Sequence, residues 1–208
     1  REARRLGAAA FLKKPFDYEE LHAVVRRVLA GPERGPGEES IRPPDAPALE
    51  LRVWGFRGPG TDEALEPSCV SLDAGGRRVV LDAGSGLRHL ASDPNPELKE
   101  IWLLLTHYHP DHVEGLRHLR WAYDPAYTVN IAGPSDTRRP LKTLVRDSLS
   151  AGGTPRAKGE VLTLSEYAFA LWPGMRVSAI FTMHPVAAVA YRLETGGRSV
   201  VYCPDNEL

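Results

Sequence analysis

Residues 101–119 read IWLLLTHYHPDHVEGLRHL, an apolar run that leads directly into a group of polar side chains. The run Ile101–Leu105 is too short for a helix of its own and predicts a buried strand. Pro110 disfavours helix at the residue before it, so the polar group is expected on a loop, with a helix from about His112. Four potential metal ligands lie on this loop: His107, His109, Asp111 and His112.

This loop has the chemistry of a metal site. Neutral imidazoles and a carboxylate suit zinc, and also manganese or iron. His107 and His109 alternate along an extended loop and can face one ion, whereas Asp111 and His112 can face a second ion beside it. Two neighbouring ions can activate water and clamp a phosphoryl or carbonyl centre. A satisfied surface feature is the alternative, but it rarely gathers four ligands so densely.

Composition places the chain among ordinary soluble proteins. Its 208 residues suffice for one medium domain and a small extra piece, and 42% are hydrophobic. A net charge of −1 recruits neither nucleic acid nor anionic membrane. Cys69 and Cys203 make no disulfide framework, and no apolar run approaches a membrane span, so we expect a cytoplasmic protein without a membrane partner. The first residue is arginine, and we expect a fragment of a longer protein.

Residues 1–30 predict a small module, and residues 31–50 predict a linker that holds five of the 18 prolines. The string GAAAFLKKPFDYEEL at 7–21 resembles the C-terminal strand and helix of a response-regulator receiver domain. That resemblance implies that Lys14 contacts a phosphoryl group and that the intact receiver has a histidine kinase partner. An ordinary strand and helix remain the alternative.

The rest of the chain, residues 51–208, alternates short strands with turns. Residues 69–73 and 78–82 predict a hairpin, since Gly75 and Gly76 lie between them. A strand at 127–131 is followed by a helix that Ser135 or Asp136 can cap. Three more strands are expected: Val177–Phe181, Val186–Leu193 and 199–202.

Several strings in this module resemble one family. The H-x-H-x-D-H string after a hydrophobic strand resembles the metal motif of the metallo-β-lactamase superfamily. VWGFRGPG from Val53 and LDAGSGL from Leu81 are similar to the opening of its ribonuclease Z-like and cyclic-nucleotide phosphodiesterase branch. His184-Pro185, Gly196-Gly197 and Asp205-Asn206-Glu207 resemble later parts of that branch.

The resemblance implies an α/β fold, a metallo-β-lactamase-type αββα sandwich over 51–208. It implies that His107, His109 and His184 hold one ion, that Asp111 and His112 hold a second, and that Asp205 bridges both. Asp111 and Asp205 would be the catalytic carboxylates, and Asp82 would anchor the histidine loop from behind. One further histidine and the last strands and helices of the family pattern are missing, so we expect a C-terminally truncated domain that can pair as a homodimer.

The implied function is metal-dependent hydrolysis of a cyclic nucleotide or other small phosphodiester, as the output domain of a two-component response regulator. Residues 138–158 hold six basic side chains and one acidic one, and Arg138 and Arg139 are the candidates for steering a phosphorylated substrate. A solvated helix face is the alternative. Three other functions stay open: a ribonuclease Z-like nuclease, a non-catalytic signalling module with a residual metal site, and hydrolysis of a thioester or lactone.

Overall fold

The structure is a computed structural model that describes residues 49–56, 66–93, 95, 97–165 and 167–207, together with residue 23. The predicted receiver-like strand and helix, with Lys14, lie outside the described residues, except for Ala23, which is helical and exposed. Nearly all of the predicted linker lies outside them too. Its last two residues, Leu49 and Glu50, are part of the first strand.

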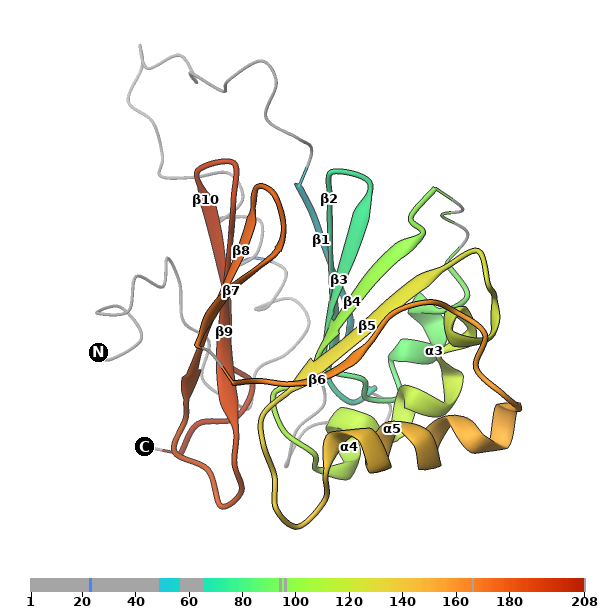
Figure 1. Cartoon of the computed structure of the whole chain (residues 1–208). Coiled ribbons are helices and arrows are strands. Elements are labelled where there is room, and N and C mark those ends of the chain that lie inside the picture. Colours follow the sequence, from blue (N-terminus) through green and yellow to red (C-terminus); the bar gives the residue numbers. More distant parts are fainter. Residues whose placement is uncertain are drawn as a thin grey trace.

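The described residues form two sheets that stack face to face (Figure 1). The first sheet has six strands in sequence order, antiparallel from β1 to β3 and parallel from β3 to β6. Its strands are β1 (Leu49–Gly55), β2 (Cys69–Ala74), β3 (Arg77–Leu81), β4 (Glu100–Leu104), β5 (Thr128–Gly133) and β6 (Val161–Thr163).

The second sheet has four antiparallel strands in the order β10-β9-β8-β7. Its members are β7 (Ala168–Trp172), β8 (Met175–Phe181), β9 (Val189–Thr195) and β10 (Arg198–Tyr202). The three predicted strands are found as β8, β9 and β10, although the strand expected from Val186 begins at Val189; β7 was not predicted.

Helices cover the face of the first sheet that points away from the second (Figure 1). They are α3 (Leu87–Leu90), α4 (Pro110–Val113), α5 (Leu141–Leu149) and the 3-10 turns η1 (Glu114–His118), η2 (Arg120–Tyr123) and η3 (Ser150–Gly152). Within the described ranges, no helix lies on the outer face of the second sheet. The described part therefore has a helix layer and two sheet layers of the predicted sandwich.

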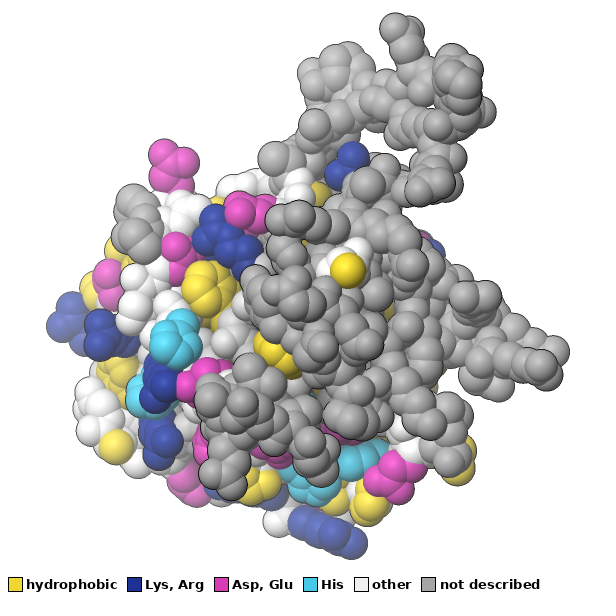
Figure 2. Space-filling view, turned by 180° about the vertical axis from the view of Figure 1, so that it is seen from behind, with side chains coloured by type: hydrophobic (Ala, Val, Ile, Leu, Met, Phe, Trp, Pro, Cys, Tyr) yellow, Lys and Arg dark blue, Asp and Glu magenta, His cyan; other side chains and the backbone are white. Residues whose placement is uncertain are grey.

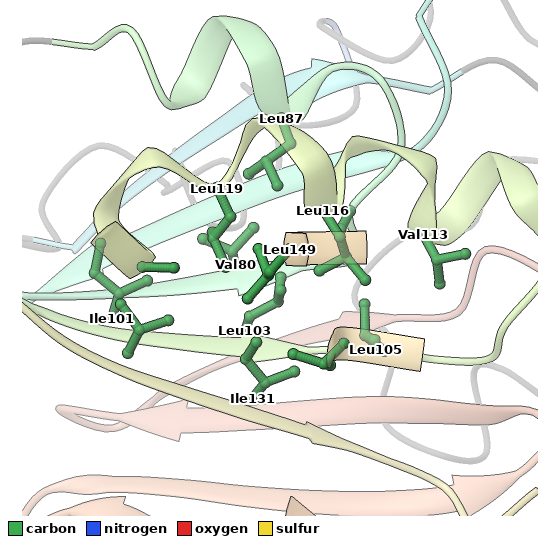
Figure 3. Packing of buried hydrophobic residues seen from close by; sticks show 14 of the residues in the cluster. Val80, Leu87, Ile101, Leu103, Leu105, Val113, Leu116, Leu119, Ile131 and Leu149 are labelled. Carbon is green, nitrogen blue, oxygen red and sulfur yellow. The ribbon is translucent and has the colours of Figure 1, made fainter. Parts of the chain in front are cut away.

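The two faces of β4 pack into different hydrophobic cores, because side chains alternate along a strand. Leu103 is fully buried with Leu116 and Leu119 between the first sheet and the helices (Figure 3). Leu104 is fully buried with Val177 and other side chains between the two sheets. The short apolar run of the sequence is thus a central strand, buried on both faces, as predicted.

Two helix predictions need correction. The helix expected from about His112 is a single turn, α4, that starts at Pro110 and continues as η1. α5 begins at Leu141 after Pro140 and has no side-chain cap, so the predicted cap by Ser135 or Asp136 is wrong. Asp136 instead accepts a hydrogen bond from the Arg138 amide within the loop.

The parallel strands β3, β4 and β5 all end at one edge of the first sheet, the lower edge in Figure 1. Loops from the second sheet reach the same edge, since β8 and β9 are joined there. Carboxyl ends of parallel strands are where α/β sheets commonly place ligand sites. Among the described residues, no helix is long and apolar enough to cross a membrane.

Candidate metal centre

The histidine loop leaves β4 in a fixed, extended path. The Leu105 amide donates to the Ala132 carbonyl (2.8 Å), and the Tyr191 hydroxyl donates to the Leu105 carbonyl (2.7 Å). The Tyr108 hydroxyl donates to the Pro134 carbonyl, so this side chain points away from its two histidine neighbours. Alternation then turns the side chains of His107 and His109 to the opposite side.

Three histidines converge at this point. His109 Nδ1 lies 3.1 Å from His107 Nε2 and 3.1 Å from His184 Nε2. Four ligands around a tetrahedral zinc at 2.0–2.1 Å are about 3.3 Å from one another. The three nitrogens therefore stand nearly where one ion would need them, although His184 is far away in the sequence and follows a strand of the other sheet.

A second group lies beside the first. His112 Nε2 is 2.9 Å from Asp205 Oδ2, and the same carboxylate oxygen is 3.6 Å from His107 Nε2. Asp205 thus lies between the two histidine groups, the position that a bridging ligand would take. Asp111 Oδ2 is 3.5 Å from His112 Nε2 and its side chain is 43% exposed, so it is at the outer side of the cluster.

The carboxylate of Asp82 supports the histidine loop and His112 through hydrogen bonds. Asp82 is fully buried directly after β3, with a φ of 60°, and its carboxylate accepts hydrogen bonds from the Thr106 amide (2.7 Å) and hydroxyl (2.8 Å). The ring of His112, through Nδ1 at 2.7 Å, and the Tyr202 hydroxyl at 3.0 Å complete its partners. The carboxylate orients His112 Nε2 toward Asp205 and fixes the start of the histidine loop.

The electrostatics of the two groups differ. Burial and the neighbouring His112 lower the pKa of His107 to about 4, which keeps that imidazole neutral and able to bind a cation. Burial alone would lower the pKa of His112, but Asp82, Asp111 and Asp205 outweigh it and raise this pKa to about 11. The hydrogen bond with His112 lowers the pKa of Asp111, so this carboxylate is ionised at neutral pH.

Sequence reasoning missed several residues that position the site. The Met183 amide donates to Asn206 Oδ1 (3.1 Å) and the Glu207 amide donates to the Met183 carbonyl (2.7 Å), which ties the His184 loop to the Asp205 segment. Glu207 Oε1 also lies 3.3 Å from His184 Nδ1, outside hydrogen-bonding geometry. The motif D-N-E was visible in the sequence, but only the fold shows which loop it holds.

Two further candidates are not among the grouped metal ligands. Arg138 and Arg139 are exposed on the loop after β5, and their role as substrate ligands stays a prediction. That loop nevertheless starts at Pro134, which accepts the hydrogen bond from Tyr108 between two of the histidines. Lys14 belongs to the part of the chain that the structure leaves undescribed.

The donor set fits divalent metal ions. Three imidazole nitrogens from two sheets converge at ligand spacing, and an imidazole and a carboxylate adjoin them. The first group suits zinc, which favours nitrogen ligands in tetrahedral geometry. At the lower edge of Figure 2, histidine side chains lie next to acidic and hydrophobic ones.

Comparison with known proteins gives a family and a fold. Residues 77–208 match the family model described as "Beta-lactamase superfamily domain". A hydroxyacylglutathione hydrolase from Baumannia cicadellinicola subsp. Homalodisca coagulata is 32% identical over 101 residues, which are 48% of this chain and 34% of that protein. The match thus spans about a third of the length of this relative.

Solved structures of low sequence identity share the architecture. The metallo-β-lactamase fold protein YhfI from Bacillus subtilis has a TM-score of 0.55 and 21% identity, over 75% of this chain and 61% of that one. The short form of human tRNase Z has a TM-score of 0.55 and 16% identity, over 74% and 68%. A diphosphatase from the PhnP family has a TM-score of 0.52 and 20% identity, over 70% and 62%. These likenesses confirm the sandwich fold predicted from the sequence.

Proposed function

The chain belongs to the β-lactamase superfamily of domains, whose members are hydrolases, and on that premise we propose that it is a metal-dependent phosphodiesterase. Its substrate would be a cyclic nucleotide or another small phosphodiester. The observation that carries the proposal is the convergence of His107, His109 and His184 beside His112 and Asp205.

Divalent ions bound at this cluster, zinc foremost and two in number, would polarise a phosphoryl oxygen and activate water. His107, His109 and His184 would hold one ion, and His112 and Asp111 the second, with Asp205 between them. Elemental analysis of protein purified without added metal tests this assignment. Close to two ions per chain supports it, and one ion or none contradicts the second site.

The residues of the chain itself have separate tasks. Asp111 is ionised and partly exposed, so its carboxylate can accept a hydrogen bond from a water molecule and orient it toward the substrate. Asp82 and Thr106 do not face the substrate; they fix the His112 ring and the start of the histidine loop. Arg138 and Arg139, exposed on the neighbouring loop, would attract the anionic substrate.

The assay should use metal-loaded protein with 3′,5′-cyclic nucleotides and bis(4-nitrophenyl) phosphate as substrates. Turnover of one of them that disappears in His109→Ala supports the proposal, because His109 contributes the nitrogen closest to both other histidines. Lys142→Ala, on an exposed face of α5, is the matched control and should retain activity. Loaded protein that turns over neither class of phosphodiester contradicts the proposal.

A second candidate is hydrolysis of a hydroxyacylglutathione, which the 32% identity to the Baumannia enzyme favours. The same metal cluster could polarise a carbonyl oxygen in place of a phosphoryl oxygen. Lactoylglutathione therefore belongs in the same assay. Turnover of this compound and not of phosphodiesters would select the second candidate.

We also propose regulation by phosphorylation, on the likeness of residues 7–21 to the end of a receiver domain. Lys14 would contact the phosphoryl group there, and a histidine kinase would supply it. The test uses the full-length protein with and without an acyl-phosphate donor. Identical turnover in both samples contradicts regulation.

A further inference from the structure

Two aromatic rings stand exposed at the end of the second sheet. On β8, the side chains that face the first sheet are Met175, Val177 and Ala179, each at most 1% exposed. The next residue on the same face is Phe181, which is 58% exposed.

Tyr167 is on this face as well, because it lies opposite Ala179: the Ala179 amide donates to the Tyr167 carbonyl at 2.7 Å. The register of β7 and β8, with Ala168 opposite Ser178, agrees with this pairing. Side chains of directly opposed residues share a face of the sheet. Tyr167 is 61% exposed.

The two rings form a defined pair. Their centroids are 5.8 Å apart and their planes are at 69°, an edge-to-face arrangement. Such a pair is favourable in itself and leaves a ring face open to a third planar group. The face of β8 that is buried at Met175, Val177 and Ala179 is thus exposed at Phe181.

The pair adjoins the metal centre. Phe181 lies opposite Val189, and the Val189 amide donates to the carbonyl of Thr106, the residue before His107. Phe181 also precedes His184 by three residues, a separation that an extended chain spans in about 10 Å. A substrate that extends about 10 Å from the metal centre can therefore reach the rings.

Met183, next to His184, is also exposed but has no aromatic ring, and the other exposed apolar side chain of β8 does not share this position. Ile180 is 45% exposed and follows the opposite alternation, so it is on the outer face of the second sheet. It lies opposite Ala190 and not beside the histidine loop. An exposed side chain on β8 is thus not unusual in itself. What sets Phe181 apart is its edge-to-face contact with Tyr167 next to the metal cluster.

We propose that Tyr167 and Phe181 bind a planar aromatic group of the substrate, a nucleobase or an aryl ring, while its phosphoester lies at the metal centre. This inference rests on the proposed function and narrows it to phosphodiesters that carry an aromatic group. Stacking of a base on an aromatic side chain is sequence-tolerant, because every base has a π-face. The subsite would thus select for a ring and not for a particular base.

Binding of two phosphonates tests the subsite without any turnover. 3-Phenylpropylphosphonate and 3-cyclohexylpropylphosphonate carry the same anionic group on a three-carbon linker that lets the ring reach the pair, but only the first has a flat ring. Calorimetric titration of metal-loaded protein should show about tenfold tighter binding of the phenyl compound, the size expected for one stacking contact. Phe181→Leu and Tyr167→Leu should each reduce this ratio, whereas Ile180→Ala, one residue away on the opposite face, should keep it.

A second readout does not depend on any variant. Nuclear Overhauser contacts from the phenyl protons to the rings of Tyr167 and Phe181 are expected in the wild-type protein. Equal affinities for the two phosphonates in the wild-type protein, or contacts to other aromatic residues only, would overturn the subsite. A ring preference without hydrolysis of any phosphodiester would overturn the proposed function and leave the subsite standing.

Discussion

Asp82 is a single carboxylate on which two elements of the candidate site depend. It accepts hydrogen bonds from the Thr106 amide and hydroxyl at the start of the histidine loop and from the His112 ring in α4. Asp82→Asn preserves size and tolerates the φ of 60°, since asparagine also adopts this region. Its amide nitrogen, however, cannot accept the hydrogen bonds that the carboxylate oxygen accepts.

We expect Asp82→Asn to weaken metal affinity about 10–100-fold, the usual effect of removing an anchor behind a metal-bound histidine. Competition against a chromophoric chelator measures it. Asp147→Asn is the control, since Asp147 is an exposed carboxylate on α5. Unchanged affinity in Asp82→Asn would show that His112 does not need its anchor.

His107 and His112 predict the pH dependence of stability in protein stripped of metal. His107 has a pKa of about 4, below the value of about 6.5 in an unfolded chain, so the unfolded state binds more protons between these values. Stability therefore falls as the pH is lowered from about 6.5 to about 4. The pKa of His112 is raised to about 11, so its contribution is complete below about 6.5 and is lost as the pH rises toward 11.

The stripped protein should thus be most stable close to pH 6.5. Urea unfolding in the presence of a chelator at pH 5, 6.5 and 8.5 measures this maximum. His112→Gln should flatten the alkaline side and also reduce the acidic side, because His112 contributes to the lowered pKa of His107. A free energy of unfolding that rises steadily from pH 6.5 to pH 8.5 would contradict the assignment.

The role of a single residue could be predicted where the residue belongs to a recognisable motif. It could not be predicted where the role depends on long-range contacts. His107, His109, His112 and Asp205 were candidates from the sequence, and the structure brings them together. Arg78 looked like an ordinary strand residue, yet it is 1% exposed and forms ion pairs with Asp73 and Asp93. Asp73 lies opposite Arg78 within the hairpin, but nothing local marks the pairing with Asp93, which is set by how the hairpin packs against the loop after α3.

At the scale of elements, the site depends on close contact between the loop after β3 and the α4–η1 segment. The Ala83 amide donates to the His112 carbonyl (2.8 Å), and the Gly115 amide donates to the Ala83 carbonyl (2.7 Å). A Cβ on Gly115 would lie 2.0 Å from the Gly84 carbonyl oxygen. Glycine is required here by this close approach of two backbones and not by a turn.

We expect Gly115→Ala to separate the two segments and to move Asp82 away from His112. Overpacking of this kind costs about 1–3 kcal/mol, and each kcal/mol lowers Tm by about 2–4 °C in a domain of this size. Thermal unfolding and metal content should both decrease. Glu114→Ala, the partly exposed neighbour, is the control, and a Gly115→Ala protein with wild-type Tm and metal content would contradict the argument.

Elements with strong local signals were predicted well. The hairpin of β2 and β3 turns at Gly75 and Gly76, which both have positive φ, 57° and 75°. β6 was missed because it has three residues and little burial, and pairing with β5 is what defines it. α5 was found from its apolar spacing, but Pro140 sets its start, where a polar cap had been expected.

At the scale of the whole molecule, the candidate ligands come from both sheets. His107 and His109 follow β4 of the first sheet, whereas His184 lies between β8 and β9 of the second sheet and Asp205 follows β10. The two-sheet architecture was predicted by resemblance to a family, since periodicity alone gives only a mixed α/β protein. The order of the strands then places the distant ligands, which no local pattern in the sequence does.

Bound metal should therefore hold the two sheets together at this edge. An ion at a thousand times its Kd stabilises by about 4 kcal/mol, so a chelator should lower Tm by roughly 10 °C. Hydrogen exchange should accelerate at 182–188 and 203–207, while β2 and β3, whose side chains are mostly buried, stay protected. Zinc added back should restore both measurements, and His109→Ala should respond to neither treatment. A uniform increase in exchange across both sheets would contradict this prediction. It would show that the metal stabilises the whole fold and not only the edge where the two sheets meet.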